Sequence, residues 1–337
     1  MRYLFLIIVC FLLFAKAEQT VAQKIHAIVI SDTNDVIIGK GCQKNLTRVE
    51  KNLTEIAENS NLKLVKYVLS GKNVSDYEIN KLIKKVNCEK DDVIFFHYSG
   101  HGSNTGFGAW PKLLLKNGGG LELRLDNIHR RLVSKAARLV ITLGDCCNLG
   151  GKTQNFANTN TAPPALLQTT NEIWKIKQHY ARLFQYAKGN ILATGTKAGL
   201  AAYFNDSLGG YFTISFFEAL YQTTHNNDIH KVSWNKILAK SQVFTNETAE
   251  SLGKQQMPYF TVQMPFDNKT TNEQTIIADN TVRQYEVKKG DNLGKIALFF
   301  TTTTDKRITA KQIQNWNGIK DPKNLQVGRI LIVYVKK

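Results

Sequence analysis

The amino-acid sequence predicts an α/β fold in which helices flank a mostly parallel sheet, followed by a small β-α-α-β domain. Short continuous apolar runs, typical of strands buried on both faces, alternate with segments whose apolar residues recur at helical spacing. An Asn- and Thr-rich stretch at residues 267–281 reads as a linker between a first domain at 23–266 and a basic second domain at 282–337. The length of 337 residues also fits about two domains.

The expected elements of the first domain alternate in type along the chain. Strands are expected at residues 25–31, 62–69, 93–96, 112–116, 138–143 and 190–194, and helices at 46–57, 77–86, 126–136, 166–188 and 212–221. Such an alternation predicts a mostly parallel sheet covered on both faces. Chemistry in these sheets tends to lie at the carboxyl ends of the strands, so reactive side chains that follow a strand are candidates for a site.

The N-terminus has the pattern of a signal peptide. Arg2 supplies a positive charge, the apolar run at 3–14 is too short to span a bilayer, and small residues at 15–17 and 20–22 offer cleavage sites. We therefore expect residues 1–22 to be removed on export, which places the mature chain in the periplasm, in the cell wall or outside the cell. An uncleaved anchor is the alternative, but no second apolar block extends the run, so no stable membrane insertion is expected.

Composition excludes wholesale disorder and bears on the kind of neighbour that the chain meets. A hydrophobic fraction of 43% is ordinary for a globular chain and excludes wholesale disorder. The 44 Lys and Arg residues against 27 Asp and Glu residues leave a net charge of +17, which indicates either an acidic or polyanionic neighbour or simply a charge that keeps the protein soluble. Because charge is the only feature that points to nucleic acid, and no motif supports it, we expect no nucleic-acid partner.

Four cysteines remain after the signal peptide: Cys42, Cys88, Cys146 and Cys147. Four are too few for a disulfide scaffold in a chain of this length, and no CxxC spacing indicates zinc, so we expect no metal site. The sequence leaves open whether Cys42 and Cys88 form a disulfide bond or stay free thiols.

Two glycine-rich segments carry the side chains of a nucleophilic reaction. Residues 95–102 read Phe-Phe-His-Tyr-Ser-Gly-His-Gly, and residues 143–150 read Leu-Gly-Asp-Cys-Cys-Asn-Leu-Gly. A cysteine nucleophile works as a thiolate and needs a histidine that takes and later returns its proton. Glycines beside the histidine let the backbone approach a substrate and leave an N–H group for an oxyanion. His101 and Cys147, each at the end of an expected strand, are therefore the candidate pair.

These segments resemble the caspase-like cysteine peptidases of clan CD, specifically the metacaspase and bacterial orthocaspase group. That group shows Asp-x-Cys-x-x-Gly around the nucleophile, which residues 145–150 match, and the resemblance extends over residues 24–263. It implies a caspase-hemoglobinase-like fold with Cys147 as the nucleophile and His101 as the general acid and base. The backbone N–H groups of Gly102 and Cys147 would form the oxyanion hole.

Two further side chains in these segments are expected to be structural. Cys146 occupies a position where the family often has a small residue, so we interpret it as a packing thiol. His97 lies within the strand end, where a core histidine is favoured over a catalytic one.

Substrate specificity is implied by the resemblance. Metacaspase-like enzymes cleave after Arg or Lys, since an acidic pocket pairs with the basic P1 side chain. Asp145 matches one acid of that pocket. The second usually follows a Gly-Cys-x-x-Asp pattern, but residues 41–45 read Gly-Cys-Gln-Lys-Asn, so a neutral Asn45 stands there. Asp32 or Asp35 in the preceding loop are candidates to compensate. A basic P1 residue is favoured, and a clan CD peptidase with another P1 preference is the alternative.

The second domain shows a β-α-α-β order. The segments Tyr-Glu-Val-Lys-Lys-Gly-Asp-Asn-Leu-Gly-Lys-Ile-Ala at 285–297 and Asn-Trp-Asn-Gly at 315–318 resemble a LysM domain. The resemblance implies binding of N-acetylglucosamine-containing glycans such as peptidoglycan or chitin. Its loops are expected to supply the glycan contacts, through Gly290, Asp291, Asn292, Asn317 and Gly318. Trp316 is expected to be a core residue.

The sequence thus predicts an exported cysteine endopeptidase that a LysM domain tethers to cell-wall glycan. We expect no cofactor. Many metacaspases respond to calcium, but the chain has no compact acidic cluster of the expected kind. A catalytically silent glycan-binding scaffold is the alternative from another class. In an active enzyme Cys147 should be alkylated much faster than Cys42 or Cys88.

Overall fold

The computed structural model describes residues 22–106, 108–115, 117, 120, 122–150, 173–226, 229, 232–264, 280–304, 308–317, 319, 321–322, 325–327 and 329–336. The predicted signal peptide up to residue 21 and the predicted linker up to residue 279 lie outside the described residues. In the part of the chain that the structure covers, no helix is both long and apolar enough to cross a membrane.

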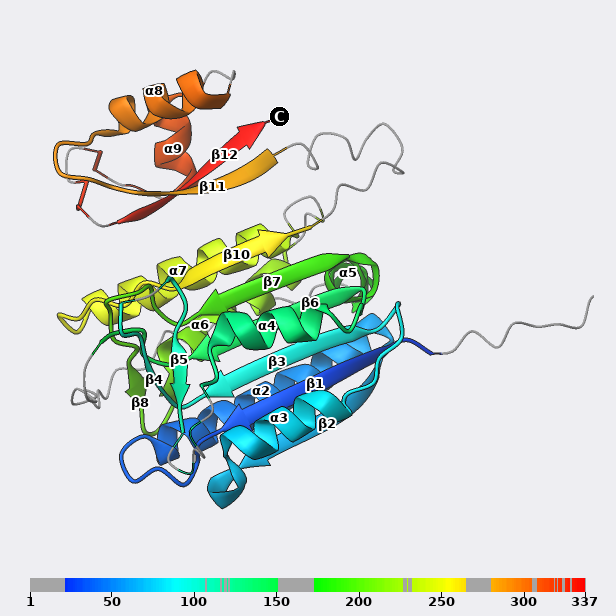
Figure 1. Cartoon of the computed structure of the whole chain (residues 1–337). Coiled ribbons are helices and arrows are strands. Elements are labelled where there is room, and N and C mark those ends of the chain that lie inside the picture. The colour runs from blue at the N-terminus through cyan, green and yellow to red at the C-terminus, as the bar shows by residue number, and fades with distance from the viewer. Residues whose placement is uncertain are drawn as a thin grey trace, which may run out of the picture.

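A six-stranded sheet forms the centre of the first domain, in the order β10-β7-β6-β3-β1-β2 (Figure 1). Its strands are β1 (Lys24–Ser31), β2 (Lys63–Ser70), β3 (Val93–Ser99), β6 (Leu139–Asp145), β7 (Gly189–Thr194) and β10 (Tyr259–Gln263). All neighbours pair in parallel except β10, which runs antiparallel to β7 at one edge. The predicted mostly parallel sheet is therefore confirmed.

Helices cover both faces of this sheet (Figure 1). One face packs against α2 (Gly39–Ser60), α5 (Ile173–Tyr180), α6 (Tyr211–Thr224) and α7 (Trp234–Glu250), and the other against α3 (Asp76–Lys85) and α4 (Leu125–Val133). The shorter elements are η1 (Gly71–Asn73), β4 (His101–Ser103), β5 (Lys112–Leu114), η2 (Ala181–Tyr186), β8 (Phe204–Asn205) and β9 (Gly209–Gly210). Helix α3 begins at the predicted cap, where the Ser75 side chain accepts the N–H of Glu78.

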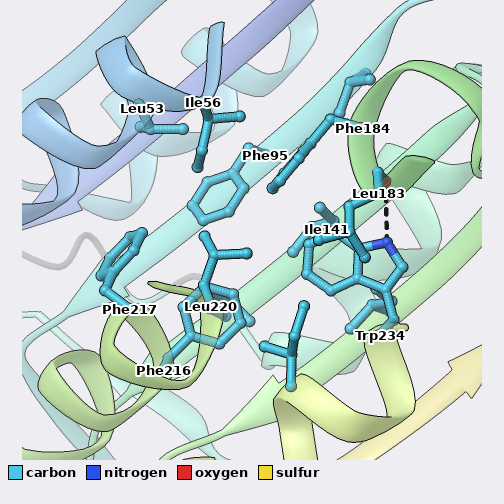
Figure 2. Packing of buried hydrophobic residues seen from close by; sticks show 14 of the residues in the cluster. Leu53, Ile56, Phe95, Ile141, Leu183, Phe184, Phe216, Phe217, Leu220 and Trp234 are labelled. Carbon is cyan, nitrogen blue, oxygen red and sulfur yellow. Dashed lines mark hydrogen bonds between the residues drawn. The ribbon is translucent and has the colours of Figure 1, made fainter. Parts of the chain in front are cut away.

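The larger core lies between the sheet and the α2, α6 and α7 side (Figure 2). Phe95 of β3 and Phe216 of α6 are fully buried and pack as tilted rings. Trp234 at the start of α7 packs edge-on against Phe184, and its indole N–H donates to the carbonyl of Leu183 at 3.0 Å (Figure 2). The indole thus fills the core without leaving its polar atom unsatisfied.

Among the differences from the sequence prediction, two concern the ends of predicted elements near β3 and α5. Strand β3 continues to Ser99, three residues beyond the predicted end, because Tyr98 and Ser99 still pair with Gly144 and Asp145 of β6. The helix predicted at 166–188 is α5 only to Tyr180, after which η2 continues as a π-helix; residues 166–172 lie outside the described residues.

The predicted β-α-α-β order of the second domain is confirmed. It comprises β11 (Asn280–Glu286), α8 (Leu293–Thr304), α9 (Ala310–Trp316) and β12 (Ile330–Lys336), with β11 and β12 antiparallel. A small core of its own includes Leu293, Ile296, Ile313 and Leu331, and Trp316 packs against that core as predicted.

Candidate active site

The two candidate catalytic residues follow the ends of neighbouring strands. His101 follows β3 after one glycine, and Cys147 is the second residue after β6. The strands end in register, with Ser99 opposite Asp145, and the N–H of Gly100 donates to the Asp145 carbonyl at 3.4 Å. Both residues therefore lie at the carboxyl edge of the sheet, where the sequence predicted a site.

Cys147 is buried, with 7% of its surface exposed. Its Sγ accepts the N–H of Ala202 at 3.3 Å and lies 3.7 Å from the Ala202 carbonyl oxygen. Burial raises the pKa of the Cys147 thiol to about 11. The Ala202 N–H group lowers this pKa in part, and the negative charge of Asp145 raises it further. The thiol is therefore protonated at neutral pH in this conformation.

Gly102 lies against the cysteine segment. A Cβ atom at this position would overlap the Cys147 carbonyl oxygen and would lie 2.8 Å from Cys146 Sγ. Only glycine permits this close approach of the two backbone segments. Cys146 itself is 2% exposed and belongs to the core on the α3 and α4 side, which agrees with the predicted packing role.

His101 faces a carboxylate that the sequence assigned to the pocket. Its Nε2 atom lies 3.4 Å from Oδ2 of Asp35, and the two side chains are only 10% and 12% exposed. The other Asp35 oxygen, Oδ1, accepts the N–H groups of Ile37 and Ile38 at 2.8 and 2.9 Å. Asp35 thus contacts His101, the candidate histidine.

A small cavity of about 30 Å³ opens beside Cys147. Asp145, Asn45 and Ser99 line it together with Cys147, and residues 202–204 close one side. The sequence thus correctly brought Asp145 and Asn45 together. Asp32 is buried but is not among the described residues that line this cavity.

Asp145 is held at the start of α6. Its Oδ2 accepts the backbone N–H of Thr213 at 3.0 Å and the Thr213 hydroxyl at 2.6 Å. A helix N-terminus favours an anion there. Burial nevertheless raises the pKa of Asp145, while Thr213, Asn45 and Arg48 lower it only in part.

Asn45 serves as a hydrogen-bond partner to the pocket acid. Its Nδ2 donates to Ser99 Oγ at 2.8 Å and to Asp145 Oδ2 at 3.4 Å, and its Oδ1 accepts the N–H of Gly210 at 2.9 Å. A carboxylate in its place would have no N–H to donate and would face Asp145 with the same charge. The neutral Asn45 therefore fits this pocket.

His97 lies beneath the pocket. Burial lowers the pKa of its imidazole to about 3, so the ring is neutral. Its Nε2 lies 3.0 Å from Thr213 Oγ1, the hydroxyl that donates to Asp145. Because that hydroxyl has a single proton, Nε2 must be the protonated nitrogen of His97. The predicted core histidine is thus linked through Thr213 to Asp145.

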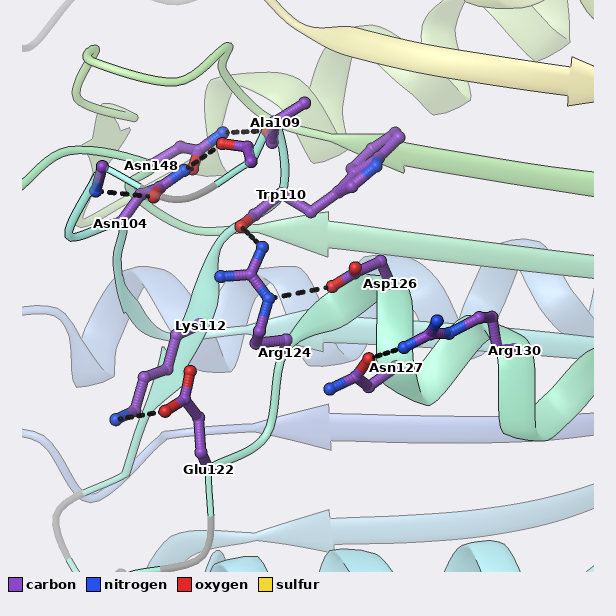
Figure 3. A network of polar contacts seen from close by, with 12 residues as sticks. Asn104, Ala109, Trp110, Lys112, Glu122, Arg124, Asp126, Asn127, Arg130 and Asn148 are labelled. Carbon is purple, nitrogen blue, oxygen red and sulfur yellow. Dashed lines mark hydrogen bonds and ion pairs between the residues drawn. The ribbon is translucent and has the colours of Figure 1, made fainter.

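Asn148 joins the loops around Cys147 (Figure 3). Its side chain is fully buried, accepts the Asn104 amide at 2.9 Å, and donates to the carbonyls of Ala109 and Thr196 at 2.8 and 3.1 Å. Because Asn104 follows β4, which begins with His101, this amide pair ties the histidine segment to the cysteine segment.

Asn148→Ala is expected to destabilise the domain by about 2–4 kcal/mol, because it removes three hydrogen bonds made by a fully buried amide and leaves Asn104 Nδ2 with its bond to Gly108. Urea unfolding measures this loss. Asn127→Ala is the matched control. Among the described residues, the Asn127 side chain bonds to the exposed Arg130 side chain alone (Figure 3), so its loss should cost under about 0.5 kcal/mol. Equal stabilities of the two variants would contradict a bracing role for Asn148.

Sequence reasoning missed three residues of this region. Ser99 had a signal, since it alternates with His97 and His101 along the strand end. Thr213, the third residue of α6, had a weak signal in the glycine pair before the helix. Asn148 had none beyond its place next to Cys147.

Cys42 and Cys88 are free thiols, which decides between the two alternatives for this pair. Cys42 is buried against the pocket, where Ser99 Oγ lies 3.5 Å from its Sγ, and Cys88 lies near the carbonyl of Lys135. Burial raises the pKa of Cys42 to about 12, with partial relief from Ser99.

The residues predicted to contact glycan differ in burial and in the hydrogen bonds that they already make within the second domain. Asp291 accepts the N–H of Lys288 at 2.7 Å and the Tyr285 hydroxyl at 3.0 Å, and Asn292 accepts the N–H of Lys295 at 2.9 Å at the start of α8. Gly290 has a φ of +88°, which favours glycine in this turn. Asn317 is buried and donates to the carbonyl of Ile313. Gly318 lies outside the described residues. The glycan role of these residues stays a prediction.

Among the described residues, no group of three or more His, Cys, Asp or Glu side chains is arranged to hold a metal ion.

Comparison with known families decides the relationship of the chain. The sequence profile of the caspase domain matches residues 25–269. The chain belongs to the caspase family. A second profile, that of the LysM domain, matches residues 285–333. Membership of the caspase family implies cysteine peptidase activity in general, and the α/β architecture of the caspase domain agrees with the predicted fold.

The similar solved structures have low sequence identity to this chain, and the curated relative matches only a short segment of it. Caspase-1 from Spodoptera frugiperda is 15% identical, with a TM-score of 0.43 over 71% of this chain and 86% of its own. Protein GSU0716 from Geobacter sulfurreducens is 15% identical, with a TM-score of 0.43 over 73% of this chain and 95% of its own. N-acetylmuramoyl-L-alanine amidase XlyA from Bacillus subtilis (strain 168) is 45% identical over 49 residues. That match covers 14% of this chain and 14% of the amidase.

Proposed function

We propose that the caspase domain is an endopeptidase in which Cys147 is the nucleophile and His101 the general acid and base. His101 takes the thiol proton, and Cys147 Sγ attacks the scissile carbonyl carbon. The N–H groups of Gly102 and Cys147 stabilise the oxyanion. His101 then gives its proton to the leaving amine, and water hydrolyses the thioester. The end of β3 beside the end of β6 supports this pairing.

A basic P1 residue is the favoured substrate feature. The observation that carries this proposal is the buried Asp145 carboxylate in the lining of the same cavity as Cys147. Guanidinium and ammonium groups pair strongly with a carboxylate in a site that excludes water. Two neighbours favour the alternative of another P1 residue: Asn45 is neutral, and Arg48 lies close enough to lower the pKa of Asp145.

Substrate binding is expected to enlarge the cavity. Its volume of about 30 Å³ is small beside the roughly 300–1,000 Å³ of typical ligand pockets, so an Arg or Lys side chain is expected to need more room. Residues 202–204 line the cavity, and Ala202 also holds the Cys147 thiol. A bound peptide is therefore expected to displace this segment from Cys147.

That expectation makes the labelling of Cys147 depend on the reagent. A peptidyl chloromethyl ketone with P1 Arg is expected to modify Cys147 at least about 100-fold faster than iodoacetamide does, because only the peptide moves Ala202 away from a thiol whose pKa burial raises to about 11. Mass spectrometry of the labelled peptides measures both rates, with Cys88 as the internal control. Equal rates with the two reagents would show that Ala202 does not protect the thiol.

Hydrolysis of peptides with P1 Arg, Lys, Asp, Asn or Ala by the mature protein, with and without calcium, tests the proposed function. Cleavage after Arg or Lys that is lost in Cys147→Ala supports both the nucleophile and the acidic pocket. Cleavage after another residue keeps the peptidase and replaces the P1 proposal. No cleavage, even after limited proteolysis, supports the glycan-binding scaffold.

We further propose that the LysM domain holds the exported enzyme on cell-wall glycan. The profile match at residues 285–333 and the similarity to a segment of an amidase support this. Sedimentation of the mature chain with insoluble peptidoglycan, in competition with N-acetylglucosamine oligomers, measures the binding. Retention that 1 M salt removes but the oligomers do not would indicate charge attraction instead of glycan recognition.

A further inference from the structure

The Asp35 carboxylate is held in one orientation. Its Oδ1 accepts two backbone N–H groups at the start of α2, from Ile37 and Ile38, at 2.8 and 2.9 Å. This pair of bonds directs the second oxygen, Oδ2, toward His101 Nε2 at 3.4 Å. The carbonyl of Asp35 also accepts the N–H of Gly39, so the backbone of the loop is tied to the helix as well. The contact with His101 is thus part of a hydrogen-bonded turn that leads into α2.

The charge of this carboxylate persists at neutral pH. Burial alone would raise the pKa of Asp35, but the N–H groups of Ile38 and Ile37 and the His101 ring outweigh burial and hold the pKa below its ordinary value. Since both side chains are about nine-tenths buried, water screens their interaction little.

The position of the carboxylate determines which ring nitrogen carries the proton. An ionised carboxylate is only an acceptor, so Nε2 of His101 must be the N–H that faces Asp35. The lone pair of a neutral His101 ring is then on Nδ1, which is the nitrogen left to take the thiol proton of Cys147. When Nδ1 gains that proton, the ring becomes a cation beside the Asp35 anion, and it later returns the proton to the leaving amine.

We propose that Asp35 is the positioning residue of a Cys147–His101–Asp35 arrangement, which fixes the tautomer and the orientation of His101. The proposal rests on the proposed peptidase function of Cys147 and His101. It differs from the role that the sequence suggested for Asp35, which was to supply a second acid to the P1 pocket.

Asp35→Asn tests whether the charge of Asp35 fixes the tautomer of His101. Asn Oδ1 can keep both bonds to Ile37 and Ile38, so the turn before α2 stays in place and the melting temperature should change by less than about 3 °C. The Asn amide then points an N–H group at His101 Nε2, where wild type has an acceptor. The ring is expected to change to the Nδ1–H tautomer, which cannot accept the thiol proton.

Two readouts separate positioning from a structural effect. The ¹⁵N shifts of the His101 ring, assigned by their loss in His101→Gln, should report Nε2–H in wild type and Nδ1–H in Asp35→Asn. The kcat for peptide hydrolysis at neutral pH should fall about 10²–10⁴-fold, with KM changed less than about threefold. Asp91→Asn is the matched control, since Asp91 is exposed before β3 at the opposite edge of the sheet, and it should change neither readout.

Each outcome decides the proposal. An Nδ1–H tautomer in the wild-type protein, or an unchanged tautomer and an unchanged kcat in Asp35→Asn, would overturn it. A wild-type protein that cleaves no peptide would refute the proposed function instead. In that case the ring shifts alone still decide whether Asp35 fixes the tautomer of His101.

Discussion

Cys147→Ala is expected to remove peptide hydrolysis, with kcat/KM lower by at least about 10⁴-fold, because the proposed thioester forms on the Cys147 Sγ atom. The loss should be as large for P1 Arg as for any other P1 residue, since the nucleophile acts on the scissile carbonyl and not on the P1 side chain. Steady-state hydrolysis of the best peptide from the P1 series measures the effect.

The neighbouring Cys146 supplies the matched control for this prediction. Its thiol packs in the core on the α3 and α4 side and is 2% exposed. Cys146→Ala should therefore cost about 1–2 kcal/mol of stability through a small cavity but should retain most of the activity. A folded Cys146→Ala protein without activity, beside an active Cys147→Ala protein, would assign the nucleophile to Cys146.

Hydrophobic periodicity predicted most of the sheet and its covering helices. The continuous apolar runs of β1 and β6 can be buried on both faces only inside a layered domain, and the structure has them there. Helix α7 was not predicted, because its buried side includes Ser241, Gln242 and Thr245. Their polar atoms bond to nearby carbonyls, for example Gln242 to Pro258 at 2.7 Å. Sequence prediction of a helix depends on apolar residues that recur at helical spacing. Where hydrogen-bonded polar residues take core positions, that spacing is lost.

The positions of the catalytic candidates were also predictable, since His101 and Cys147 carry a local pattern of glycines and strand ends. Their partners were not. Asp35 meets His101 because its carboxylate is held by the backbone of the turn before α2, and that loop conformation has no periodic signal. Asp145 and Thr213 are 68 residues apart and Asn45 and Asp145 are 100 apart, so their contacts arise only from the packing of α2 and α6 against the sheet.

Asp145→Asn is expected to remove the preference for a basic P1 residue. The ratio of kcat/KM for P1 Arg to that for P1 Ala should fall about 10²–10³-fold, the equivalent of roughly 3–4 kcal/mol for a buried charge-assisted contact. The Asn side chain keeps an acceptor for the Thr213 donors, so α6 should stay in place. Arg cleavage at the wild-type rate would show that Asp145 does not bind the P1 side chain.

The pH dependence provides an independent check on the same carboxylate. Because burial raises the pKa of Asp145, its folded form binds a proton more tightly than the unfolded chain does, and its contribution to stability is lost as pH rises through that pKa. Asp145→Asn should therefore gain melting temperature relative to wild type as pH rises above the ordinary Asp range. Over the same range the wild-type preference for P1 Arg should increase, since only the ionised carboxylate attracts the cation.

Thr213→Val deletes the hydroxyl donor that favours the ionised form of Asp145. It should therefore move both the change in stability and the change in P1 preference to higher pH. If melting temperature and P1 preference change at the same pH in Thr213→Val and in wild type, a group other than Asp145 controls them.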